Sequence, residues 1–456
     1  MSDTIAAIAT GGAISAIGIV RVSGGGAIAA ADMVFRAFGG IRLADADSRR
    51  MYYGELTGAD GGLIDLCLCV ISRGPDSYTG EDTVEFHCHG SPVVLSEALR
   101  SLFARGVRQA EAGEFTKRAF LNGRMDLTQA EAVIDLIDAE TPTAARNAAG
   151  QLRGAIGRRL KAVYSTLLDI IAHFHAVIDY PDEDIDEFKM KSYLSMLLDA
   201  EKELGRMLST HERGRILRDG VPTAIIGRPN TGKSSLLNAL LGYERAIVTD
   251  LPGTTRDTIE EKILFGGTLL RLIDTAGLRK THDTVEKLGV GRTLDALSGA
   301  GLVLLVLDGS EPLQDGDFEA LRSIPSGVPR LAVVNKSDLP GVLDADELAR
   351  LGVDYCRVSA LTGMGLDVLD AEVKKMFPKP GTAPSGEIIT NARQAEAISR
   401  AKAGVNLAVE AIKASVTPDA VLTDIEAALK AVGEVTGDTM REDIISRIFE
   451  RFCVGK

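Results

Sequence analysis

A glycine-rich loop ending in lysine and serine is the segment of this sequence best suited to bind phosphate. It reads Gly227-Arg228-Pro229-Asn230-Thr231-Gly232-Lys233-Ser234, a complete G-x-x-x-x-G-K-S pattern, and it follows the apolar run Ala224-Ile225-Ile226. The residues from Ser235 to Leu240 are expected to form a helix behind it. In such a loop the glycines let backbone N–H groups curl around phosphate oxygens, and the helix adds its positive dipole end. We expect Lys233 to reach the outer phosphates of a nucleotide and the Ser234 hydroxyl to bind Mg²⁺.

Three motifs downstream of this loop have residue types that recognise guanine and the third phosphate. In Asp274-Thr275-Ala276-Gly277 the aspartate can lie near the metal and the glycine N–H can contact the γ-phosphate. In Asn335-Lys336-Ser337-Asp338 the last carboxylate can accept two N–H bonds from guanine, a donor pair that adenine lacks. Ser359-Ala360 resembles the loop whose backbone N–H contacts the guanine oxygen. Because all four motifs occur in order, we predict GTP rather than ATP.

Hydrolysis needs a group that orients the attacking water, and the usual group is missing here. Leu278 follows the D-x-x-G motif where Ras-like GTPases place a glutamine, and a leucine cannot hydrogen-bond water. Glu286 is the nearest carboxylate that could replace it; the alternative is that Glu286 is a charge on a helix surface. Arg228 could act as an arginine finger, but beside Pro229 it is expected to face solvent.

A bound cation can take the place of an arginine finger. Asn230 supplies a neutral oxygen, and the loop from Thr249 to Thr255 supplies hydroxyl and carbonyl oxygens. Hard oxygen ligands without extra carboxylates suit a monovalent ion. The residues predicted to bind GTP are therefore Asn230, Thr231, Gly232, Lys233, Ser234, Ser235, Thr249, Asp250, Leu251, Pro252, Gly253, Thr254, Thr255, Asp274, Thr275, Ala276, Gly277, Asn335, Lys336, Asp338, Ser359, Ala360 and Leu361.

The composition places these motifs in a soluble, multidomain protein. A chain of 456 residues with 45% hydrophobic and 25% charged residues is ordinary for two to four globular domains. The start has no basic region typical of a signal peptide, and the strongest apolar run, Leu302 to Leu307, is too short to span a bilayer. Five cysteines without zinc spacing indicate reduced thiols in the cytosol. A net charge of −13 argues against non-specific binding of polyanions, although a local basic patch can still bind nucleic acid.

Four segments with three kinds of pattern predict the domain organisation. Residues 1–118 alternate short apolar runs with glycine-rich turns and predict an α+β domain. Residues 119–216 and 381–456 have helical periodicity, whereas residues 217–380 alternate strands and helices, as in a parallel α/β sheet. We therefore predict one helical domain interrupted by an inserted Ras-like P-loop G domain, since insertion only requires the two crossing points to lie close together.

Motifs outside the nucleotide site identify a family. They are Gly18-Ile19-Val20-Arg21-Val22-Ser23-Gly24, Ser77-Tyr78-Thr79-Gly80-Glu81-Asp82, Gly113-Glu114-Phe115-Thr116-Lys117-Arg118-Ala119-Phe120-Leu121-Asn122-Gly123 and the C-terminal Phe452-Cys453-Val454-Gly455-Lys456. With these motifs the whole chain resembles the MnmE (TrmE) family, the bacterial and mitochondrial GTPases of wobble-uridine tRNA modification. The nucleotide motifs alone would not separate it from other GTPases, but the two ends of the chain do.

The resemblance implies a homodimer built through the N-terminal domain, which in this family binds a tetrahydrofolate derivative. Arg21, Glu85, Arg124 and Lys456 match the folate-contact positions. Arg124 stands where the family often has lysine, so charge is kept but hydrogen-bond geometry is not. Without the resemblance, Arg21 and Glu85 would be interpreted as ordinary charges at strand ends. In the family the cysteine at position 453 lies near the folate and is linked to the modification chemistry; the sequence shows no adjacent base to lower its pKa.

In the G domain the resemblance implies that K⁺ and G-domain dimerisation accelerate hydrolysis. The matching K⁺ ligands are Asn230, Thr249, Leu251 through its carbonyl, and Thr254. Thr255 joins Ser234 on Mg²⁺, and Glu286 matches the glutamate that positions the water.

The implied function is a K⁺-stimulated, cytoplasmic GTPase of tRNA modification that needs no membrane. As a heterotetramer with an MnmG/GidA-type protein that carries FAD, it would add a carboxymethylaminomethyl or aminomethyl group to C5 of the wobble uridine. The folate, in its 5,10-methylene form, would supply the carbon unit. The flavin is expected on the partner because this chain has no G-x-G-x-x-G fingerprint with its acidic residue.

A ribosome-assembly GTPase whose flanking domains only bind RNA is the rival interpretation. It shares every nucleotide motif but predicts a basic RNA-binding module instead of a folate site. Arg153, Arg158, Arg159 and Lys161 could form such a module, and a solvated helix face explains them equally well. Folate binding separates the two interpretations.

Overall fold

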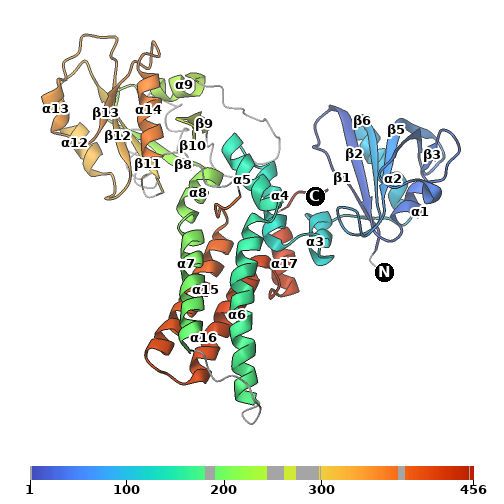
Figure 1. Ribbon diagram of the computed structural model, residues 1–456. Helices are drawn as coiled ribbons and strands as arrows, with labels where there is room; N and C mark the ends of the chain where they lie inside the picture. Colours follow the sequence, from blue (N-terminus) through green and yellow to red (C-terminus); the bar gives the residue numbers. More distant parts are fainter. Residues whose placement is uncertain are drawn as a thin grey trace. The chain divides into compact units, whose positions relative to one another are not determined.

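The computed structural model describes residues 3–179, 190–243, 261–273, 297, 299–377, 386–450 and 452–455 (Figure 1). The chain forms two compact units. Unit 1 consists of residues 1–134, 149–206 and 396–456, and unit 2 of residues 135–148 and 207–395. Of the helices in these described ranges, none is both long and apolar enough to cross a membrane.

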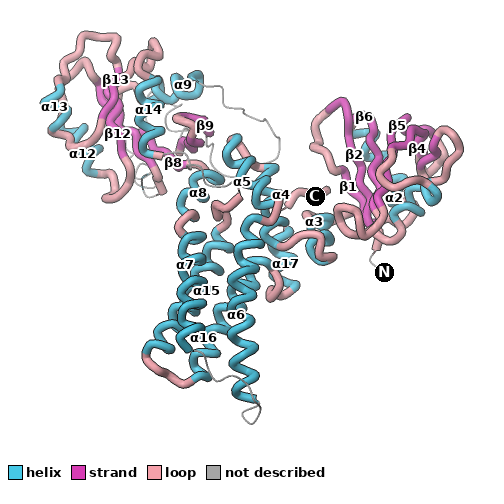
Figure 2. The backbone as a smooth tube through the Cα atoms, in the orientation of Figure 1, coloured by secondary structure: helices cyan, strands magenta, loops and turns pink. Residues whose placement is uncertain are grey.

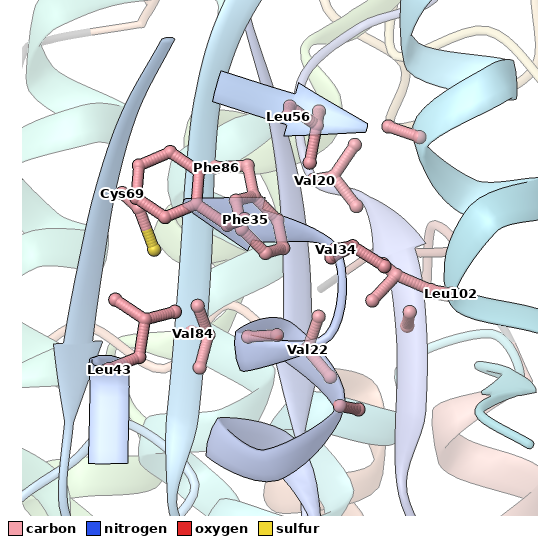
Figure 3. Close-up of a cluster of buried hydrophobic side chains, with 14 of the residues drawn as sticks. Val20, Val22, Val34, Phe35, Leu43, Leu56, Cys69, Val84, Phe86 and Leu102 are labelled. Atoms are coloured by element: carbon pink, nitrogen blue, oxygen red, sulfur yellow. The ribbon is translucent and has the colours of Figure 1, made fainter. Parts of the chain in front are cut away.

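Unit 1 begins with a seven-stranded, mostly antiparallel sheet in the order β3-β4-β5-β6-β2-β1-β7, in which only β1 and β7 are parallel. The strands are β1 (Ile5–Ile8), β2 (Ser15–Ser23), β3 (Phe35–Ala37), β4 (Met51–Thr57), β5 (Leu63–Ser72), β6 (Thr83–Gly90) and β7 (Arg108–Gln109). Helices α1 (Ala27–Asp32) and α2 (Pro92–Phe103), with the short 3₁₀ helix η1 (Leu43–Asp45), pack on one face. Side chains alternate between the two faces of a strand, so Val20, Val22, Val84 and Phe86 point into this core (Figure 3).

The other face of the sheet carries a different set of residues. The strand register places Ile19, His87, Leu68 and Tyr53 opposite one another, and likewise Arg21, Glu85, Val70 and Met51. Phe115 packs against β1 at one edge of this face in a small cluster with Ile5, Ala7 and Ala110. Further along the face, Met51, Tyr53, Leu66 and Leu68 are exposed.

The helical part of the chain lies on both sides of the G domain in sequence, as predicted. Its elements are α3 (Glu114–Leu121), α4 (Leu127–Ile137), α5 (Pro142–Leu152), α6 (Ala155–Asp179), α7 (Met190–Leu208), α15 (Ala392–Lys413), α16 (Pro418–Thr436) and α17 (Glu442–Phe449). Within unit 1, α6 packs along α16, although the two are far apart in the sequence (Figure 2). The buried positions of α6 recur every three or four residues, at Ile156, Leu160, Val163, Leu167, Ile170 and Phe174, which is the spacing of one helix face.

The C-terminal segment also packs within unit 1. Ile445, Phe449 and Phe452 form a buried cluster with Leu127 and Ala130 of α4. Val454 forms an antiparallel bridge with Ala112, just before α3. The end of the chain is thereby tied to the same segment that leads into α3.

Unit 2 contains a six-stranded sheet in the order β13-β12-β11-β8-β10-β9, in which only β9 is antiparallel. Its elements are α8 (His211–Asp219), β8 (Val221–Ile226), α9 (Lys233–Tyr243), β9 (Glu261–Phe265), β10 (Thr268–Leu272), β11 (Leu302–Asp308), α12 (Asp315–Arg322), β12 (Arg330–Asn335), α13 (Ala345–Ala349), β13 (Tyr355–Arg357) and α14 (Leu366–Met376). Alternate residues of β11 enter two separate cores on the two faces, so the apolar run from Leu302 to Leu307 is a strand buried on both sides. The predicted combination of an α+β domain, a helical domain and a Ras-like G domain is confirmed; the exact boundaries after residues 118, 216 and 380 stay a prediction.

Candidate functional site

The glycine-rich loop follows β8 and leads into α9, at the carboxyl edge of the parallel strands. Two of its residues must be glycine for steric reasons. A Cβ on Gly227 (φ +148°) would lie 2.3 Å from the Val306 carbonyl oxygen, and one on Gly232 (φ +93°) would lie 2.1 Å from Asn335 Nδ2. Both contacts are far below a real Cβ approach, so the loop can pack this closely only because these side chains are absent.

Asn335 at the end of β12 joins the loop to its neighbour. Its buried side-chain amide donates to the Thr231 carbonyl at 2.9 Å, and its Oδ1 accepts the Ala360 N–H at 3.0 Å. One amide therefore fixes the phosphate loop and the Ser359-Ala360 loop to each other. The asparagine of the N-K-x-D motif is thus a structural link as well as part of the guanine motif.

Lys233 has no acidic partner among the residues that the structure describes. Its ammonium donates to the carbonyls of Gly227 at 2.9 Å and Arg228 at 2.6 Å. Burial lowers the pKa of this ammonium. A partly buried cation held only by neutral carbonyls is an electrostatic site for an anion, which is the role that the sequence predicts for this lysine.

The predicted guanine side of the site is arranged around two carboxylates. Burial alone would raise the pKa of Asp308, but hydrogen bonds from Lys336 and Ser310 outweigh it and lower that pKa. Asp338 is exposed and accepts a hydrogen bond from the buried Ser359 hydroxyl at 2.5 Å, which orients the carboxylate and leaves it accessible to a base. Asp308 is not among the residues predicted from the sequence, whose only sign of it is the end of the apolar run from Leu302 to Leu307; the strand register places it directly opposite Asn335.

Arg228 does not face solvent, which corrects the expectation from its position beside Pro229. Its Nε donates to Asp317 Oδ1 at 2.8 Å, and its side chain is only 15% exposed. Asp317 is buried and also accepts the Gln314 N–H at 3.0 Å, so it caps α12 at the same time. Gly316 lies so close that a Cβ there would be 3.0 Å from Arg228 Cδ. Arg228 is therefore anchored at the start of α12. An arginine held by this ion pair is not available as an arginine finger.

The remaining predicted nucleotide residues divide into described and undescribed positions. Asn230 (φ +64°) and Ser235 are exposed, Ser234 is partly buried at the start of α9, and Leu361 is 84% exposed beside Ala360. The predicted residues that lie outside the described part of the chain are Thr249, Asp250, Leu251, Pro252, Gly253, Thr254, Thr255, Asp274, Thr275, Ala276, Gly277 and Glu286.

In unit 1 the structure brings together three of the four residues predicted to contact folate. Arg21 and Glu85 are directly opposite on β2 and β6, and their side chains form an ion pair at 2.7 Å (Nε to Oε1). The Arg21 guanidinium lies 5.5 Å from the centroid of the Tyr78 ring. Gly80 lies two residues further along this loop, and a Cβ there would be 3.3 Å from Cγ of the exposed Arg124. The loop that carries Tyr78 and Gly80 thus links the ion pair to Arg124.

The C-terminal motif reaches the same domain. The Cys453 carbonyl accepts the Gly113 N–H at 3.2 Å, and the Cys453 side chain is exposed. A Cβ on Gly455 (φ +98°) would lie 2.2 Å from the carbonyl oxygen of Ile8, on the strand beside β2. Lys456 lies outside the described residues.

Comparisons with known proteins cover the whole chain. The family model described as "GTP-binding protein TrmE N-terminus" matches residues 4–124, and the one described as "MnmE helical domain" matches residues 127–453. The "tRNA modification GTPase MnmE" of Alkaliphilus metalliredigens is 43% identical over 460 residues, covering 100% of both chains. The protein of the same name from Heliobacterium modesticaldum is 44% identical, again over 100% of each. The solved G domain of the T. maritima FeoB iron transporter is 29% identical and covers 34% of this chain and 96% of its own; its TM-score of 0.26 is too low to carry an argument.

The Arg228–Asp317 pair generates a prediction about nucleotide binding. Asp317→Asn keeps an acceptor for the cap of α12 but removes the charge that holds Arg228. Because a hydrogen bond to a charged group contributes about 1.5–3 kcal/mol, we expect GDP to bind about ten-fold more weakly. Binding of a fluorescent GDP analogue measures this. Glu311→Gln is the control, since Glu311 is half exposed and lies 3.6 Å from the same guanidinium. Equal affinities for wild type and Asp317→Asn would contradict the anchoring role.

Proposed function

The chain belongs to the MnmE family of tRNA modification GTPases, and on this premise we propose that it is a K⁺-stimulated GTPase acting on the wobble uridine of tRNA. GTP hydrolysis would time a conformational cycle, while the carbon chemistry takes place in the domains outside the G domain. Two observations carry the nucleotide part: among the described residues the Lys233 ammonium has carbonyl groups as its partners and no carboxylate, and the Asp338 carboxylate is accessible. A phosphate neutralises the first and a guanine edge pairs with the second.

The proposed hydrolytic machinery combines one metal ion, one monovalent cation and one carboxylate. Mg²⁺ would be held by Ser234 and Thr255 and would neutralise charge on the phosphates. The neutral ligand set proposed for K⁺ is Asn230, Thr249, Leu251 and Thr254. The described member of this set, Asn230, is an exposed residue of the phosphate loop, as a ligand must be. Since Arg228 is engaged by Asp317, a bound cation is the better source of positive charge at the site. Glu286 would position the attacking water.

We propose that unit 1 binds a tetrahydrofolate derivative, in its 5,10-methylene form, beside the Arg21–Glu85 pair. The residues fit such a ligand because charged and aromatic groups converge there: an ion pair, the Tyr78 ring and the exposed cation of Arg124. The folate would supply a one-carbon unit when bound. Arg21, Glu85, Arg124 and Lys456 would hold it, and the exposed Cys453, which the Gly113 N–H ties to the start of α3, would take part in the transfer.

The open face of the N-terminal sheet supports the proposed homodimer. Four apolar side chains share this face and are exposed by 38–54%, namely Met51, Tyr53, Leu66 and Leu68. They lie on the adjacent strands β4 and β5, on the same face as Arg21 and Glu85. Adjacent exposed apolar side chains on one sheet face are typical of a protein–protein interface. A second copy of this domain would bury them.

The modification itself would require a partner. We propose a heterotetramer with an MnmG/GidA-type protein carrying FAD, since the sequence of this chain has no dinucleotide fingerprint. tRNA would be the substrate of the complex and the cytoplasm its compartment. The rival, a ribosome-assembly GTPase, lacks an explanation for the converging groups around Arg21 and Glu85.

GTP turnover in KCl and in NaCl tests the hydrolytic machinery. We expect strong stimulation by K⁺ in the wild type, and we expect Glu286→Ala to lower turnover by about 100-fold because the attacking water loses its partner. Asp283→Ala, which removes a carboxylate three residues away, is the control and should leave the stimulation unchanged. Equal turnover in both salts would mean that Asn230 and the loop after Thr249 bind no K⁺.

Calorimetric titration with tetrahydrofolate tests the folate site. Glu85→Gln keeps the shape of the side chain but removes its charge, so we expect binding to weaken about ten-fold. His89→Gln on the same strand is the matched control, since His89 is 75% exposed. If the wild type binds no folate and associates tightly with ribosomal RNA, the rival function is correct.

Sedimentation analysis tests the dimer face. Leu68→Asp places a charge among the exposed apolar residues of the open sheet face, and we expect it to convert the dimer to a monomer. Val93→Asp introduces the same charge on α2, which packs against the opposite face and where Val93 is 71% exposed. A dimer that persists in Leu68→Asp but dissociates in Val93→Asp would contradict the proposal, because the interface would then lie on the face covered by α2.

A further inference from the structure

The segment between Glu140 and Asp169 has an unusual charge. Residues 141–168 contain Arg146, Arg153, Arg158, Arg159 and Lys161 and no acidic residue, in a chain where 64 of 456 residues are Asp or Glu. The protein as a whole carries a net charge of −13. Since that charge repels RNA, a segment of this kind is where a polyanion could approach.

In the structure, one of these cations forms an ion pair with a carboxylate and others do not. Arg159 Nε donates to Glu203 Oε1 of α7 at 2.6 Å, so its charge is neutralised within the helical bundle. Arg153, Arg158 and Lys161 are exposed, and no carboxylate in the described ranges forms an ion pair with them. Arg158 Nη1 donates to the Arg153 carbonyl at 2.5 Å, which holds these two residues together at the turn from α5 to α6. Lys161 follows Arg158 by three residues on α6 and so lies on the same helix surface.

One carboxylate, that of Asp126, lies beside this surface, and its contacts are with neutral groups of the chain. Asp126 Oδ1 accepts the Thr128 hydroxyl at 2.6 Å and the Gln129 N–H at 2.9 Å, and so caps the start of α4. Its other oxygen packs against Gly157, where a Cβ would lie only 2.2 Å away. The Gln129 side chain in turn donates to the Leu152 carbonyl at 2.8 Å. These contacts fix the start of α4 beside the turn that carries the three free cations.

This position links the basic surface to the residues proposed for the one-carbon chemistry. Met125 and Leu127, next to Asp126, pack in the cluster that contains Phe452, the residue before Cys453. Arg124 directly precedes Met125 in the sequence. All of these residues belong to unit 1. A strand of RNA held by the three cations would therefore lie alongside Arg124 and the C-terminal segment.

We propose that Arg153, Arg158 and Lys161 form a phosphate-binding surface that positions the tRNA substrate. This inference rests on the proposed function, because that function makes tRNA the substrate. It adds where on unit 1 the tRNA binds, which the proposed function leaves open. The two guanidinium groups match phosphate oxygens as planar forks, and the lysine adds a point charge. Such contacts position a nucleic acid without reading its sequence, as expected for an enzyme that acts on several tRNAs.

The test compares two triple variants of the full-length protein in tRNA binding over a range of salt concentrations. In the first variant Arg153, Arg158 and Lys161 are each changed to Gln. In the control, Arg42, Arg100 and Lys413 are changed to Gln; they are exposed cations of unit 1 in ion pairs, and the change in net charge is the same. We expect the first variant to bind at least ten-fold more weakly at fixed salt. The slope of log K against log salt should become shallower by about 2–3, since each lost phosphate contact removes about 0.7–0.9.

Each other outcome overturns the inference in a distinct way. An unchanged affinity and salt slope in the first variant, while the wild type binds tRNA, would exclude this surface but leave the proposed function intact. Equal weakening by the control would show that only net charge matters. If polyglutamate binds and is weakened as tRNA is, the surface accepts an acidic protein instead. A wild type that hydrolyses GTP but does not bind tRNA would remove the proposed substrate together with this surface. GTP turnover and circular dichroism should be unchanged in both variants, which confirms that they fold.

Discussion

The nucleotide site depends on the close approach of two loops that one buried amide holds together. Asn335 can donate to the phosphate loop and accept from the Ser359-Ala360 loop because Gly232 leaves room for it. The same edge places Asp308 beside Asn335 and orients Asp338 through Ser359. The residues predicted to contact phosphate and guanine lie at three different strand ends, so their spacing is set by this one residue and by the parallel sheet beneath it. Burial of the amide makes the link costly to break, since its polar atoms would lose their partners away from water.

The two units handle charge in opposite ways. In unit 2 the Lys233 ammonium has carbonyl partners and no carboxylate within the described ranges, so its positive charge is available to a ligand. In unit 1 the buried Arg118 is paired with Asp3, Glu81 and Glu114 at 2.7–3.0 Å, which joins the start of the chain, the loop with Tyr78 and helix α3. Such a network stabilises a scaffold, because removing any one partner leaves an uncompensated charge. Arg124 and the basic surface at the turn from α5 to α6 are exposed cations that form no ion pair within the described ranges, so they can meet substrates.

Local sequence patterns were sufficient to predict the G domain and its nucleotide motifs. Its motifs follow apolar strands, and the carboxyl ends of parallel strands meet at one edge, so residues far apart in sequence could be expected to converge. The sequence could not show pairs that depend on side-chain reach across loops. Arg228 and Asp317 are 89 positions apart, and nothing near either residue signals the other. Arg21 and Glu85 likewise resemble ordinary strand charges until the register places them opposite each other. The family resemblance, rather than periodicity, suggested these two together, whereas their contact with Tyr78 required the structure.

The division of the helical domain into two chain segments also governs how it can fold during synthesis. Helix α6 ends at Asp179 and its packing partner α16 begins at Pro418, with the whole G domain encoded between them. A ribosome adds about 5–20 residues per second, so α16 is synthesised on the order of tens of seconds after α6. During that interval the G domain can complete its own sheet, while the side of α6 that packs on α16 is not yet covered. The nascent chain is therefore most prone to aggregation, and most in need of chaperones, after its nucleotide site has formed and before its last helices emerge.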